Sequence, residues 1–88
     1  MKIKDGYALK KVAGENLIIN SGPDAADFKR VIRLNNTAAF MWQRLAEGKT
    51  PEQTAQAVAE EYSVDPGKAL ADVEGFAAKL VKGGLAEE

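Results

Sequence analysis

The fold is decided at residues 34–45, which read LNNTAAFMWQRL. Before this run the apolar residues follow a period of two, and within it they recur at a period near 3.6, as in an amphipathic helix. Asn35 or Asn36 supplies a helix cap, because the Asn side-chain oxygen accepts from a free backbone N–H at a helix start. The run therefore predicts a strand that ends at Leu34 and a helix that extends to about Glu47.

Three short strands are predicted upstream of this junction. Residues 7–12 and 17–20 flank a turn around Gly14, which is the pattern of a hairpin. A loop over residues 21–27 separates the hairpin from a third strand at residues 29–34. Alternation divides this third strand into two faces, with Arg30, Ile32 and Leu34 on one and Lys29, Val31 and Arg33 on the other.

Two further helices are predicted downstream, each with a clear start signal. The second begins with the capping-box pattern TPEQ at residues 50–53 and runs to about Tyr62. The third has Asp65 as its cap and runs from Pro66 to about Lys82, where two glycines follow.

Strands followed by helices predict an α+β fold in a single domain over residues 1–88. We expect a winged-helix-like domain, in which an N-terminal three-stranded antiparallel sheet at about residues 6–34 precedes a three-helix bundle at about residues 36–82. The tight link between the second and third helices is typical of a helix-turn-helix. The aromatic side chains of Phe40, Trp42 and Tyr62 occur at helical spacing and are expected in the core.

Composition excludes several classes of function. The 88 residues carry a formal net charge of −1 and contain neither cysteine nor histidine. Cysteine-free chains have no disulfide and no thiolate site, and the absence of histidine removes the commonest general base and zinc ligand. We therefore expect no catalytic residue, no metal and no cofactor. The sequence has no targeting or membrane-spanning run, which predicts a soluble cytoplasmic protein.

The run at residues 34–45 resembles the signature of the PqqD-like family. The resemblance continues through residues 50–53, 62–65, 72–76 and 83–85, and the upstream strands also occupy the positions they have in that family. It covers nearly the whole chain, and its specificity comes from the order and spacing of the pieces.

The resemblance implies a non-catalytic peptide chaperone. PqqD-like domains are similar to RiPP recognition elements, which bind the leader segment of a ribosomally made precursor peptide. In them the leader adds as a strand to the edge of the third strand, in a cleft against the third helix. A partner enzyme, often a radical S-adenosylmethionine (radical SAM) enzyme, then modifies the core of the same peptide, and in the namesake pathway the product is pyrroloquinoline quinone (PQQ).

Two segments would form the peptide site that the resemblance implies. From the residues alone, an ordinary solvated strand with its cations outside is the better interpretation of the third strand, and Leu70 is as well explained as core. The resemblance favours peptide capture, since an open strand edge with positive charge suits an acidic leader. The predicted peptide-binding residues are Lys29, Arg30, Val31, Ile32 and Arg33 on the strand, and Leu70, Glu74, Ala77 and Val81 on the third helix.

Two alternatives come from other functional classes. A winged-helix DNA-binding regulator would insert the N-terminal turns of the third helix into the major groove. Those turns carry Lys68 against Asp65 and Asp72, so they would repel phosphates, and no nucleic-acid partner is expected. The other alternative is a homodimeric adaptor that exchanges elements through a hinge at residues 21–28.

Overall fold

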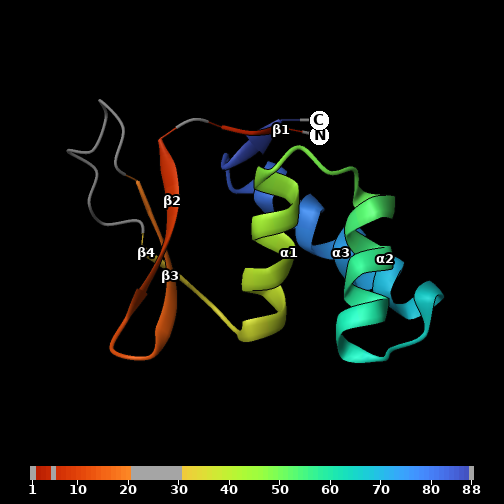
Figure 1. The fold of residues 1–88 in the computed structure, drawn as a ribbon. Helices are drawn as coiled ribbons and strands as arrows, with labels where there is room; N and C mark the ends of the chain where they lie inside the picture. Colours follow the sequence, from red (N-terminus) through yellow and green to blue (C-terminus); the bar gives the residue numbers. More distant parts are fainter. Residues whose placement is uncertain (1, 5, 21–30, 88) are drawn as a thin grey trace.

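Eight elements make up the computed structural model, which describes residues 2–4, 6–20 and 31–87. Three strands form an antiparallel sheet on one side, and α1 lies between this sheet and α2, with α3 packed behind (Figure 1). This arrangement confirms the expected α+β class with its sheet followed by three helices. In chain order the elements are β1 Lys2–Ile3, β2 Tyr7–Val12, β3 Glu15–Asn20, β4 Val31–Leu34, α1 Asn36–Ala46, α2 Pro51–Tyr62, α3 Pro66–Lys82 and β5 Ala86–Glu87.

A two-residue turn closes the β2–β3 hairpin. Val12 pairs with Glu15, and the intervening Ala13 and Gly14 have φ angles of 53° and 81°. Left-handed backbone at both positions is the requirement of a type I′ turn, whose twist matches that of the flanking strands. Because an alanine rarely occupies such a position, the sequence predicted the turn one residue later. β3 therefore begins at Glu15 and not at Leu17 as expected.

The sheet has the strand order β2-β3-β4, with both pairings antiparallel. Ile18 in the central strand lies opposite Leu9 on one side and Ile32 on the other. Directly opposed residues share a face of a sheet, and Ile18 is only 1% exposed. This row therefore marks the face of the sheet that meets the helices.

Each helix begins at the cap that the sequence predicts. Asn35 caps α1 by accepting a hydrogen bond from the Ala38 backbone N–H at 2.8 Å. Thr50 begins α2 with a complete capping box, and Asp65 accepts from two backbone N–H groups at the start of α3. None of the helices that the structure describes is long and apolar enough to cross a bilayer.

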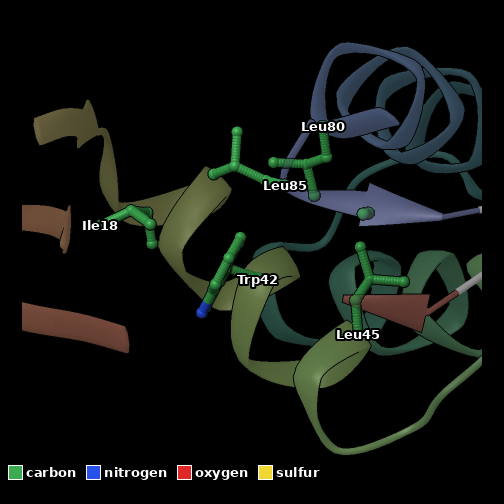
Figure 2. Close-up of a cluster of buried hydrophobic side chains, with 6 residues drawn as sticks. Ile18, Trp42, Leu45, Leu80 and Leu85 are labelled. Carbon is green, nitrogen blue, oxygen red and sulfur yellow. The ribbon is translucent and has the colours of Figure 1, made fainter. Parts of the chain in front are cut away.

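Two clusters of buried side chains hold the layers together. The first joins the sheet, α1, α3 and β5 around Trp42, which is 2% exposed, with Ile18, Leu80 and Leu85 about it (Figure 2). The second joins the three helices around Val73, which is fully buried. The expectation that Trp42 belongs to the core is confirmed.

The C-terminal segment folds back onto the first cluster. Gly84 has a φ of 81°, a left-handed value that glycine adopts without strain, and the Leu85 N–H donates to the Leu80 carbonyl at 2.8 Å. β5 then pairs antiparallel with β1, which brings the two ends of the described chain side by side. The sequence did not predict this pair, because two-residue strands are too short to show alternation.

Tyr62 does not join the core as expected. It is the last residue of α2 and is 38% exposed. Its ring packs edge-on against Phe40 at a centroid distance of 5.6 Å, and its hydroxyl is 3.5 Å from the Asn36 carbonyl. The position at a helix end explains the difference, since the chain leaves the bundle there and the phenol keeps one side in water.

Candidate functional site

The candidate site centres on β4, at one edge of the sheet. Within the described residues β4 pairs with β3 and with no other strand. Successive residues of a strand direct their N–H and C=O groups to alternate sides. About half of the backbone groups in Val31–Leu34 therefore face away from β3, and such an edge is a template for another extended segment.

The predicted strand residues divide between the two faces of the sheet. Ile32 faces inward and packs against the cluster around Trp42. Val31 faces outward and is 50% exposed. Arg33 also faces outward, and its guanidinium lies 3.4 Å from the Glu15 carboxylate, but both side chains are solvated, so the pair contributes little to stability. The remaining two, Lys29 and Arg30, lie outside the described residues.

The four predicted helix residues lie along one flank of α3. Glu74 is exposed, whereas Leu70, Ala77 and Val81 are half-buried. Val81 packs against the same cluster as Ile32, so the structure brings these two elements of the predicted site onto one core. Leu70 packs instead with the cluster that joins the three helices, away from the sheet.

A hollow of about 480 Å³ opens between the start of α1 and the opposite flank of α3. We refer to it as the α1–α3 hollow. It begins at Asn35, the residue that directly follows β4, and the predicted α3 residues do not line it. Its lining comprises Asn35, Thr37, Ala38 and Met41 from the α1 side and Ala71, Asp72, Gly75, Phe76 and Lys79 from α3.

None of these α3 residues was predicted from the sequence to bind a peptide. One signal for them was present, namely Gly75, because a glycine in the interior of a helix is unfavourable unless something requires it. Predicting which flank of α3 lines the hollow also requires knowing which side of the helix meets the β4–α1 junction. That relationship is tertiary and leaves no periodic signal.

The rim of the α1–α3 hollow carries one carboxylate and one ammonium group. Asp72 is already paired, since its Oδ2 lies 3.1 Å from the Lys68 Nζ. Lys79 is exposed and has no side-chain partner among the described residues. The uncompensated charge at the rim is therefore positive. No group of three His, Cys, Asp or Glu side chains that could hold a metal ion occurs in the described part of the chain.

The chain is similar to one family model and to two solved structures. The family model is described as coenzyme PQQ synthesis protein D (PqqD) and matches residues 19–86. That range includes β4, all three helices and the last two residues of β3. No curated protein matches the chain.

Both solved structures superimpose on almost the whole chain. TbiB1 in complex with the TbiA(beta) leader peptide has a TM-score of 0.79 and 28% identity, covering 99% of this chain and 95% of that one. Lasso peptide synthetase B1 complexed with the leader peptide has a TM-score of 0.78 and 24% identity, covering 99% and 96%. The second shares the fold, and the first adds a sequence likeness.

Proposed function

The chain belongs to the PqqD family, and on that premise we propose that it is a non-catalytic recognition protein for a leader peptide. In this proposal it binds the leader segment of a ribosomally made precursor and presents the rest of the peptide to a modifying enzyme. The observation that carries the proposal is that β4 pairs with β3 alone among the described strands, in a fold that a leader-peptide complex shares at 28% identity.

Strand addition suits the geometry of β4. An extended peptide beside Val31–Leu34 would complete backbone hydrogen bonds that no described strand makes. Alternate side chains of that peptide would then fall on the inner face, beside Ile32 and close to α3, and on the outer face, beside Arg33. An acidic leader residue on the outer face could exchange with Glu15 at little cost, because the existing ion pair is solvated.

The chemistry would reside in a partner. Leader binding holds the peptide while a separate enzyme, a radical SAM enzyme or another peptide-modifying enzyme, acts on the core segment. The expected setting is the cytoplasm, where ribosomes make the precursor. The precursor leader is thus the first partner and the enzyme the second.

DNA binding has weaker support. A recognition helix needs cations at its N-terminal turns to draw in phosphates. The first cation of α3 is Lys68, and its Nζ lies 3.1 Å from the Asp72 carboxylate. A second carboxylate, that of the N-cap residue Asp65, lies at the start of the helix. The field at this end of α3 would therefore oppose a nucleic acid.

The proposal can be tested without knowledge of the natural leader. A displayed library of random peptides is panned against the purified chain, and an enriched peptide is synthesised and titrated into it by calorimetry. We expect enrichment of extended sequences with alternating apolar residues and acidic neighbours, and a saturable one-to-one heat signal. A library from which the chain enriches no sequence would contradict the proposal.

The same titration distinguishes peptide binding from self-association. If β4 pairs with a second copy of the chain, dilution should change the molecular mass measured by light scattering, and added peptide should compete with the dimer. A chain that remains a dimer at saturating peptide would show that the edge serves the homodimeric alternative.

A further inference from the structure

Gly75 has no structural reason to be a glycine. It lies in the middle of α3, where glycine is among the least favourable residues, and it is exposed. A Cβ built at this position meets no atom within 4 Å. Its φ does not lie in the left-handed region either. Neither close packing nor backbone conformation therefore explains the residue.

The open space at Gly75 belongs to the α1–α3 hollow. Ala71, one turn before Gly75, and Lys79, one turn after it, line the same hollow. The floor of the hollow is apolar. It is formed by Met41 of α1, which is 4% exposed, and by the half-buried Phe76 of α3. A side chain at position 75 would project into this space and reduce it.

The hollow also adjoins the C-terminal end of β4, the proposed peptide edge. It begins at Asn35, and Leu34 directly before it is the last residue of β4. A peptide that runs along β4 therefore passes the mouth of the hollow as it leaves the strand. Among the described residues that line the hollow, Lys79 carries the only uncompensated charge, and it favours a carboxylate on the peptide.

We infer that the α1–α3 hollow is the pocket that reads one leader residue, a large apolar or aromatic side chain next to an acidic residue, and that Gly75 keeps this pocket open. The inference rests on the proposed leader binding and specifies which side chain the leader must carry. Phe76 and Met41 contact the large side chain, and Lys79 faces the carboxylate.

Five variants test the inference, and four of them form two matched pairs. Gly75→Leu fills the hollow, whereas Ala78→Leu places the same side chain on an exposed part of α3 that does not line it. Lys79→Glu reverses the charge at the rim, whereas Lys82→Glu reverses a charge in the same last turn of α3 but outside the hollow. The probe is a peptide enriched from the random library by the wild-type chain.

We expect Gly75→Leu to weaken binding of that peptide by about tenfold or more, the effect of losing one apolar anchor. Ala78→Leu should bind like wild type. Lys79→Glu should weaken binding and recover when the acidic peptide residue is replaced by Lys, and Lys82→Glu should change little. Gly75→Ala should raise the thermal unfolding midpoint and still lower affinity, which separates the pocket from the stability of the helix.

Two failures lead to different conclusions. If the library enriches peptides and Gly75→Leu binds them as tightly as wild type, the α1–α3 hollow does not bind the leader side chain. The proposal of leader binding is then still supported. If the wild-type chain enriches no peptide, the proposal of leader binding is wrong, and so is the inference about the α1–α3 hollow that rests on it.

Discussion

Ile18 and Ile32 lie directly opposite each other across β3 and β4, and both pack on the face that meets Trp42. Leu9 begins this row on β2, so the row ends at Ile32 on the open edge. A strand added to β4 would extend it by one further side chain. In the proposed strand addition, one peptide residue would therefore lie beside Ile32 on the inner face of the sheet.

Proline at Val31 or Ile32 should separate peptide binding from stability. Only one of two consecutive residues directs its N–H to the open edge, and the other donates into the pairing with β3. We expect one proline variant to keep the wild-type unfolding midpoint and lose about tenfold or more in peptide affinity, while the other is destabilised. Alanine at the same positions keeps the N–H groups and serves as the control. Equal peptide affinity in both proline variants would argue against strand addition.

Charge reversal at Arg33 should weaken peptide binding in a salt-dependent manner. The Arg33 side chain is 72% exposed, so its attraction for an acidic peptide is screened at high ionic strength. We predict a larger loss of affinity for Arg33→Glu at low salt than at high salt, measured by titration. Lys49→Glu, an exposed change between α1 and α2, is the control. A loss that does not vary with salt would assign Arg33 a packing role.

Trp42 should be the most sensitive core position. It is 2% exposed and joins the sheet to α1, α3 and β5. Trp42→Ala should lower the free energy of unfolding by about 3–5 kcal/mol, a large part of the total for a domain of this size. Urea denaturation followed by circular dichroism measures the change, with Trp42→Phe as a milder comparison. A loss below about 1 kcal/mol would show that the cluster re-forms without the indole.

Thr54 offers a stabilising substitution. Its side chain is fully buried in α2, and its hydroxyl has no hydrogen-bond partner within the described part of the chain. Thr54→Val replaces the hydroxyl by a methyl group of similar size, and we expect the free energy of unfolding to rise by about 1 kcal/mol. Thr54→Ser keeps the hydroxyl and removes a buried methyl, so it should be destabilising. If Thr54→Val also lowers the unfolding free energy, the hydroxyl has a partner after all.

Local signals in the sequence were sufficient for most of the fold. The helix starts after Thr50 and Asp65 were predicted, and the cap of α1 was predicted as Asn35 or Asn36, because a cap and its N–H partners lie within a few residues of one another. The edge position of β4 was proposed from family resemblance, and the strand order confirms that position. Non-local pairing explains the omissions, since β1 meets β5 across nearly the whole chain.

The site was less predictable than the fold. The strand side of the site follows from the alternation of Ile32 with Val31 and Arg33, which the register reproduces. On α3 the predicted flank and the flank that lines the hollow differ, because a helical wheel gives the core stripe but not the neighbour on each side. Gly75 marks the second flank by an unfavourable residue, and its meaning emerges only when the open space around it is seen.

The central claim is that a peptide adds as a strand to the open edge of β4. Amide hydrogen exchange of Val31–Leu34, measured by NMR with and without a saturating library-selected peptide, tests it most directly. We expect alternate amides of β4 to become strongly protected from exchange when the peptide binds. The amides that already pair with β3 should change little. Full binding of the peptide with unchanged exchange along β4 would contradict it.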